Sequence, residues 1–103
     1  MHKVKRIQDY AFYKSLTGLA FVEQIVLYGS RAREDNQDRS DIDLAIACPE
    51  ANGEQWQQVL KIIEEADTLL KIDLVRLESL SPNNPLRVSV LRDGQTLFDR
   101  KSA

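Results

Sequence analysis

The sequence lacks the features that mark secreted or membrane-spanning proteins. It contains a single cysteine, Cys48, so no internal disulfide can form, and this fits a reducing compartment. No apolar run approaches the roughly 20 residues that a membrane helix needs. The basic N-terminal residues 1–6 are not followed by an apolar signal region. We therefore expect a cytoplasmic protein without a membrane partner.

An excess of positive charge is also missing. The 14 basic and 16 acidic residues give a net charge of −2, which argues against strong general nucleic-acid binding. There is no Gly-Lys-Ser/Thr phosphate loop. Residues 35–46 are not a calcium-binding EF-hand loop, because Ser40 stands where glycine is needed and Ile46 where glutamate is needed.

The 103 residues favour one domain, residues 1–103, with 43% hydrophobic and 29% charged residues, as is usual for a globular chain. Apolar periodicity and turn residues predict alternating helices and strands, with Gly94 capping the last helix and Trp56 anchoring the longest one to the sheet. The expected helices are residues 5–19, 30–35, 54–70 and 85–92, and the expected strands are residues 21–28, 41–48, 72–77 and 96–98.

The central feature is a Gly29-Ser30 turn after an apolar strand, followed by Asp41 and Asp43 at the start of the next strand. Successive side chains of a strand point to opposite faces, so these two acids share one face while Ile42 and its apolar neighbours share the other. Two adjacent carboxylates repel each other, and a divalent cation between them would relieve the repulsion. Hard oxygen ligands suit Mg²⁺ or Mn²⁺.

This pattern resembles the signature of the nucleotidyltransferase superfamily that includes DNA polymerase beta. The longer strings, Gly-Ser-Arg-Ala-Arg and Ser-Asp-Ile-Asp-Leu, resemble its small stand-alone branch, the minimal nucleotidyltransferases. Alternating elements alone would favour a doubly wound parallel sheet. The resemblance implies instead an α/β (α+β) fold like the polymerase beta palm, with a mixed central sheet and helices mainly on one face.

The resemblance also implies roles for the site residues. Gly29 and Ser30 would bind the triphosphate, and Asp41 and Asp43 would bind the metal ion. A third acid completes such sites, and Asp73 is the candidate inside a predicted strand; it could also act as base toward an acceptor hydroxyl. The structural alternatives are that Ser30 merely caps a helix and that Asp73 is an ordinary exposed strand residue.

The arginines of the motif are candidates for contacting the phosphates. Arg33, rather than Arg31, is our candidate for contacting the phosphates, and a solvated surface arginine is the alternative. Many relatives carry glycine after the Arg-Ala-Arg, whereas this chain has Glu34 and Asp35. The stretch from Arg31 to Asp43 holds three arginines and five acids, which favours a cation but opposes a bare triphosphate.

The resemblance implies a metal-dependent nucleotidyltransferase that transfers a nucleoside monophosphate from a nucleoside triphosphate, with ATP favoured, to a hydroxyl group. It also implies an antitoxin role beside a helical HEPN-type toxin partner. Because every element is used to build the core, we expect the partner to supply the acceptor. The alternative is a binding module that keeps the fold and neutralises its partner by contact. A homo-oligomer is left open.

Overall fold

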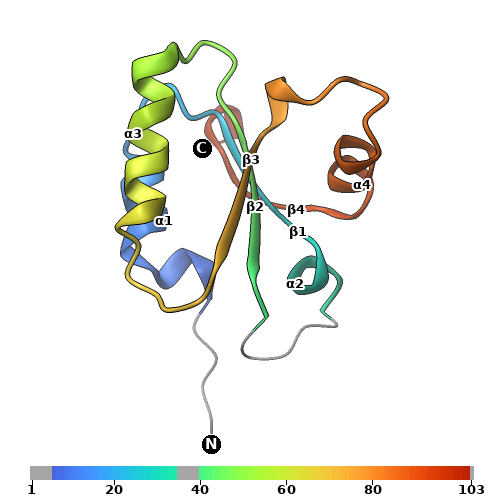
Figure 1. Ribbon diagram of the computed structural model, residues 1–103, viewed down its shortest axis with the longest axis horizontal. Coiled ribbons are helices and arrows are strands. Elements are labelled where there is room, and N and C mark those ends of the chain that lie inside the picture. Colours follow the sequence, from blue (N-terminus) through green and yellow to red (C-terminus); the bar gives the residue numbers. More distant parts are fainter. Residues whose placement is uncertain (1–5, 35–39, 103) are drawn as a thin grey trace, which may run out of the picture.

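The computed structural model describes residues 6–34 and 40–102, in which helices and strands alternate around one sheet (Figure 1). The strands are β1 (Gln24–Tyr28), β2 (Ile42–Ala47), β3 (Ile72–Arg76) and β4 (Gln95–Asp99). The α-helices are α1 (Ala11–Thr17), α2 (Ser30–Arg33), α3 (Gly53–Glu64) and α4 (Pro85–Asp93), and three short 3-10 helices are Ile7–Asp9, Leu77–Ser79 and Arg100–Ser102. Within the described ranges no helix is both long enough and apolar enough to span a bilayer.

The sheet is mixed, as predicted. Its strand order is β3-β2-β1-β4; β1 runs antiparallel to both β2 and β4, while β2 and β3 are parallel. The parallel pair needs a crossover, which α3 provides. The predicted edge strand at residues 96–98 is confirmed as β4. The consequence for the site is that β2 lies between β1 and β3, so its first residues have a neighbouring strand on either side.

The two faces of the sheet are covered unequally. Helices α1 and α3 lie together on one face and α4 lies on the other (Figure 1), while the short α2 follows the end of β1 and contributes Ala32 to the larger core. The α1–α3 face holds the larger core, to which β2 contributes Ile42, Leu44 and Ile46, all fully buried. The smaller cluster on the α4 face consists of Val26, Ala45, Leu77 and Val90. The main helical layer is thus on one face, as expected, and the short α4 adds a second, smaller one.

Helix α3 begins as predicted but ends earlier. Asn52 caps it by accepting a hydrogen bond from the Gln55 backbone N–H, and the Gln55 side chain accepts one from the Asn52 N–H. The predicted end at residue 70 is wrong: the helix stops at Glu64. The Asp67 carboxylate accepts hydrogen bonds from the backbone N–H groups of Ala11 and Phe12 at the start of α1. This contact with a distant helix requires residue 67 to leave α3.

The prediction of one continuous helix over residues 5–19 is also wrong, because the structure has two shorter helical segments there. Lys5 lies outside the described residues. A 3-10 turn at Ile7–Asp9 is separated from α1 by Tyr10, whose backbone is extended at φ −80° and ψ 146°. Asp9 accepts a hydrogen bond from the Arg6 N–H and so closes the first turn on itself. A separate helix, α1, can begin at Ala11 because the Asp67 carboxylate accepts hydrogen bonds from its first N–H groups.

The remaining boundaries shift by a few residues. Strand β1 begins at Gln24 rather than at residue 21, although Val22 is fully buried. Arg100 explains this difference, because its guanidinium Nε donates to the Val22 carbonyl and its backbone N–H donates to the Glu23 carbonyl. Gly94 does cap α4 as predicted, with an extended backbone; a side chain there would overlap the Val90 carbonyl oxygen and the Val26 side chain.

Candidate functional site

The turn between β1 and α2 is built around Gly29. Its φ of 73° lies in the region that residues with a side chain rarely adopt. A Cβ atom at this position would overlap the carboxylate of Asp43. Gly29 is the N-cap of α2, and its carbonyl accepts hydrogen bonds from the Ala32 and Arg33 N–H groups. Ser30 is therefore the first residue of the helix, and not the cap that the structural alternative assumed.

Three carboxylates meet at one end of β2 and β3. The parallel register pairs Asp43 directly with Asp73, and Asp41 stands just before β2 begins. Ile42 and Leu44 are buried in the larger core, so Asp43 faces the other side of the sheet. The predicted sharing of one face by Asp43 and Asp73 follows from this pairing. Their roles in binding or catalysis stay predictions.

The charges of these acids act on one another. The pKa of Asp43 is raised above its usual 3.8 first by burial, then by the charge of Asp73, by a side-chain hydrogen bond with Asp73, and by the charge of Asp41. The Arg31 guanidinium works in the opposite direction and lowers it. The net effect is a raised pKa of Asp43, and a bound cation would relieve the part of it that comes from the neighbouring carboxylates.

Lys71 also contacts this group. Its Nζ lies 3.4 Å from Oδ1 of Asp73, and both side chains are well exposed, at 71% and 41%. Its backbone carbonyl accepts a hydrogen bond from the Ile42 N–H. Lys71 and Asp41 line the same surface hollow, together with Leu69 and Leu70. Sequence reasoning missed Lys71, which lies directly before β3 and two residues before Asp73.

The two arginines of the motif lie differently. Arg31 donates from Nε to the carbonyls of Ser40 and Asp41 and from a terminal guanidinium nitrogen to the Ser40 carbonyl, at 2.8–3.3 Å. It thereby ties α2 to the start of β2. Arg33 is exposed; the pKa of Asp93 at the end of α4 is lowered first by a side-chain hydrogen bond with Arg92, and the charge of Arg33 adds a smaller effect in the same direction. The structure thus brings Arg31 close to Asp43, while the phosphate contact predicted for Arg33 stays a prediction.

Tyr28 is a second residue that sequence reasoning passed over. It is the last residue of β1, it pairs with Asp43 across the antiparallel ladder, and it packs beside the smaller cluster. Burial raises the pKa of its phenol, and the charges of Asp43 and Asp73 raise it further. Tyr28, Asp43 and Asp73 therefore form a row across three strands on one face. Strand alternation with Val26 could have revealed this placement.

The carboxylates do not form a closed metal cage. Across residues 6–34 and 40–102, no set of three or more His, Cys, Asp or Glu side chains is arranged to hold a metal ion by itself. Mg²⁺ does not require such a cage, because it is usually held by one or two carboxylates together with substrate phosphates and water. The donor set of Asp41, Asp43 and Asp73 fits that open type of site.

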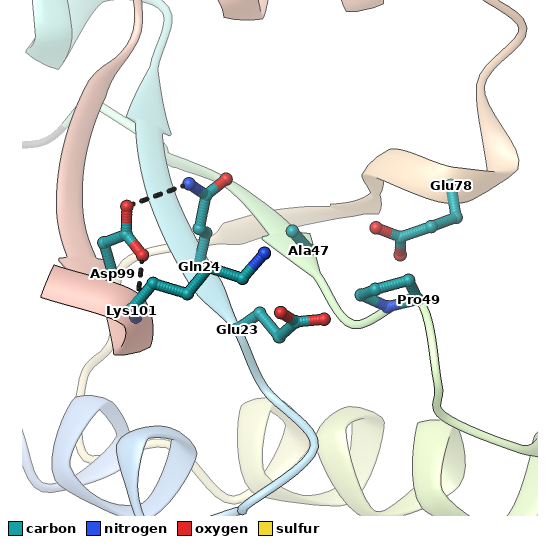
Figure 2. A pocket seen from close by; sticks show the side chains of 7 residues that line it. All are labelled: Glu23, Gln24, Ala47, Pro49, Glu78, Asp99 and Lys101. Atoms are coloured by element: carbon teal, nitrogen blue, oxygen red, sulfur yellow. Dashed lines mark hydrogen bonds between the residues drawn. The ribbon is translucent and has the colours of Figure 1, made fainter.

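A separate hollow of about 230 Å³ lies at the other end of the sheet (Figure 2). It is lined by residues that include Glu23, Gln24 and Asp99, and Gln24 donates a side-chain hydrogen bond to Asp99. Gln24 is the first residue of β1, whereas Tyr28 and Gly29 lie at its far end. This hollow is therefore distinct from the carboxylate group, and none of the predicted site residues lines it.

With this geometry described, the chain can be compared with known proteins. A family model described as "Polymerase beta, Nucleotidyltransferase" matches residues 13–103. A Methanocaldococcus jannaschii protein named "Putative protein adenylyltransferase MJ1379" is 35% identical over 66 residues, which are 62% of this chain and 64% of that protein. The match thus spans less than two thirds of that relative.

Solved structures share the fold. A toxin–antitoxin structure with AMP-PNP superposes with a TM-score of 0.64 at 23% identity, covering 88% of this chain and 73% of that chain. The complex of a tri-AMPylated Shewanella oneidensis HEPN toxin with an MNT antitoxin gives a TM-score of 0.57 at 22% identity, covering 87% of this chain and 69% of that chain. At these identities the likeness demonstrates a common fold.

Proposed function

Because the chain belongs to the polymerase beta-type nucleotidyltransferase family, we propose that it transfers a nucleoside monophosphate from ATP to a hydroxyl group in a metal-dependent reaction. The observation that supports this most directly is the contact between the two halves of the motif. The backbone of Gly29 lies against the carboxylate of Asp43, and Asp43 is paired with Asp73. A turn suited to phosphate and a group of acids suited to a cation are thus immediate neighbours.

The donor nucleotide would lie on the β1 side of Asp43. Gly29 carries no side chain, and the Asp43 carboxylate occupies the space that a Cβ atom would need, so the turn would hold the phosphates next to this acid. Ser30 adds a hydroxyl group and a backbone N–H at the start of α2. Arg31 on α2 donates hydrogen bonds to the carbonyls of Ser40 and Asp41. These bonds would fix the position of the Gly29-Ser30 turn relative to the acids.

Asp41 and Asp43 would hold the metal ion, with Asp73 completing the set. When bound, the divalent cation neutralises charge on the triphosphate and polarises the phosphorus under attack. The pKa of Asp43 is raised first by burial and then by the charges of Asp73 and Asp41, and a bound cation would offset the repulsion among these carboxylates.

The acceptor hydroxyl would approach from the β3 side. Because β2 lies between β1 and β3, Gly29 and Asp73 flank Asp43 from opposite sides. Donor and acceptor can then approach one another in line, and positioning of this kind lowers the barrier by several kcal/mol. Asp73 would take the proton of the attacking hydroxyl while its oxygen bonds to the α-phosphorus, and the bond from that phosphorus to the oxygen of the β-phosphate breaks to release pyrophosphate.

The proposed acceptor is a hydroxyl side chain of a HEPN-type toxin, for which this protein would act as the antitoxin. Support comes from the related folds, which include a toxin–antitoxin structure with AMP-PNP and a tri-AMPylated HEPN toxin in complex with an MNT antitoxin. The relative from M. jannaschii, named as an adenylyltransferase, agrees with transfer of AMP to protein.

The test is to recover the native partner and search it for added AMP. Tagged wild type and the Asp43→Asn variant would be isolated from the native cell, incubated with α-labelled ATP and Mg²⁺, and the partner analysed by mass spectrometry. We expect a nucleoside monophosphate on a partner hydroxyl with wild type and none with Asp43→Asn. A partner that binds equally to both proteins and is never modified would show a binding module instead. Efficient transfer to RNA or to a free small molecule would contradict the proposed acceptor.

A further inference from the structure

One contact of the carboxylate group is not explained by the function proposed above. Lys71 Nζ is 3.4 Å from Asp73 Oδ1, so the acid expected to join the metal site already has a cationic partner. The placement is built into the sheet. In the parallel register Ile42 pairs with Ile72, and Asp41 and Lys71 each stand one residue earlier. Lys71 lies directly before β3, where its carbonyl accepts a hydrogen bond from the Ile42 N–H, and its ammonium reaches Asp73 from there.

The pair is open to exchange. Both side chains are substantially exposed, and exposed ion pairs of this kind change an equilibrium constant by about fivefold or less. The Lys71 side chain borders a surface hollow with Asp41, Leu69 and Leu70, so it has room to leave Asp73. Its backbone position does not depend on the pair, because the Lys71 carbonyl is held by the Ile42 N–H at 2.9 Å.

The charges of the three acids favour replacement of the Lys71 ammonium by a divalent cation. Asp43 and Asp73 are partners in the parallel register and Asp41 stands two residues before Asp43, so these like charges repel one another. A single ammonium beside Asp73 offsets part of that repulsion. A divalent cation would offset more of it, and the two cations would compete for the same carboxylate. Lysine suits such a temporary role, since its ammonium is a compact charge on a flexible stem with no fixed geometry to lose.

We propose that Lys71 is an exchangeable counter-ion of Asp73, which holds this carboxylate while no divalent cation is bound and releases it when one binds. Lys71 is thus a positioning residue, and it sets the metal concentration at which the site fills. The inference rests on the proposed metal site at Asp41, Asp43 and Asp73.

The experiment measures Mn²⁺ binding alone, without nucleotide or turnover, by the loss of the free Mn²⁺ electron paramagnetic resonance signal. Lys71→Met removes the competing charge and should tighten Mn²⁺ binding about three- to fivefold at low ionic strength. Most of the gain should disappear in high salt, where exposed charges are screened. Lys71→Arg keeps the charge and should bind as wild type does. Lys61→Met, an equal charge change on the exposed side of α3, should also leave binding unchanged.

The controls separate this inference from the function on which it rests. Circular dichroism would confirm that each variant is folded, and Lys71→Gln provides a second neutral side chain. If wild type binds Mn²⁺ and Asp43→Asn does not, but both neutral Lys71 variants match wild type or bind more weakly, the counter-ion role is overturned and the metal site stands. If wild type binds Mn²⁺ neither alone nor with a non-hydrolysable ATP analogue, the metal site is overturned and the role of Lys71 with it.

Discussion

The backbone of Gly29 touches the carboxylate of Asp43, so that a Cβ atom at position 29 would overlap that side chain. Fourteen positions separate the two residues, and they meet because β1 and β2 form an antiparallel pair in which Tyr28 lies opposite Asp43. The turn and the acids are therefore one structural unit. The effects of substituting these two residues on the free energy of unfolding should therefore be coupled.

The first prediction concerns that contact. Gly29→Ala should destabilise the fold by about 1 kcal/mol or more, because φ is +73° and the new methyl group meets the Asp43 carboxylate. Gly29→Val should in addition abolish nucleotide binding. Gly53→Ala is the matched control, since a Cβ atom there would have no neighbour within 4 Å. Urea unfolding and calorimetric titration with a non-hydrolysable ATP analogue provide the measurements.

A double-mutant cycle makes the first prediction specific. If the two residues are coupled, part of the cost of Gly29→Ala should vanish in an Asp43→Ala background, leaving only the backbone strain. Additive effects would show that the overlap has no energetic consequence. Undiminished nucleotide affinity in Gly29→Val would show that the turn is purely structural.

The second prediction concerns the metal. Mg²⁺ or Mn²⁺ should bind wild type, and the Asp41→Asn, Asp43→Asn double variant should lose that binding, because it removes two of the three charges that attract the cation. Isothermal calorimetry measures this directly. Equal metal binding by the two proteins would exclude a site at these residues.

The third prediction is a pH dependence of stability. The pKa of Asp43 is raised in the folded state, so folding favours its protonated form. Its contribution is therefore favourable below about 3.8 and is lost as the pH rises through the raised pKa. Without metal, Asp43→Asn should be at least as stable as wild type at pH 7, and its advantage should shrink as the pH falls toward 4. Urea unfolding followed by Trp56 fluorescence between pH 4 and 7 tests this; an advantage that grows on acidification would contradict it.

The fourth prediction concerns Ser30 at the start of α2. Ser30→Ala should weaken ATP binding by roughly 1 kcal/mol or somewhat more, the size of a lost hydrogen bond to a charged group. The free energy of unfolding should change little, because Gly29 and not Ser30 is the N-cap. Comparing calorimetric affinities with urea midpoints separates the two effects. An equal loss in both would indicate a structural role.

The fifth prediction concerns the long-range cap of α1. Asp67→Ala should destabilise the protein by about 1 kcal/mol, because it leaves the Ala11 and Phe12 N–H groups without the carboxylate that accepts their hydrogen bonds. Glu64→Ala, an exposed position at the end of α3, is the control and should be nearly neutral. Nucleotide binding should be unaffected in both.

Local chemistry in the sequence determined the order of the elements and the neighbourhood of the acids. Alternation of Ile42, Asp43 and Leu44 was enough to predict which face each would occupy, because only one face could be buried. The Gly29-Ser30 turn and the start of α3 at Asn52 were likewise readable, since glycine conformation and capping depend on a few adjacent residues.

Contacts between distant segments were decided by the tertiary structure alone. Helical periodicity could not predict the end of α3 at Glu64, because the Asp67 carboxylate beyond it accepts hydrogen bonds from N–H groups of a helix more than fifty residues earlier. The pairing of Asp43 with Asp73 depends on the parallel register of β2 and β3. The approach of Lys71 to Asp73 depends on the path of the chain directly before β3. Register is a property of two strands together, so no pattern along one strand could specify which charges would meet.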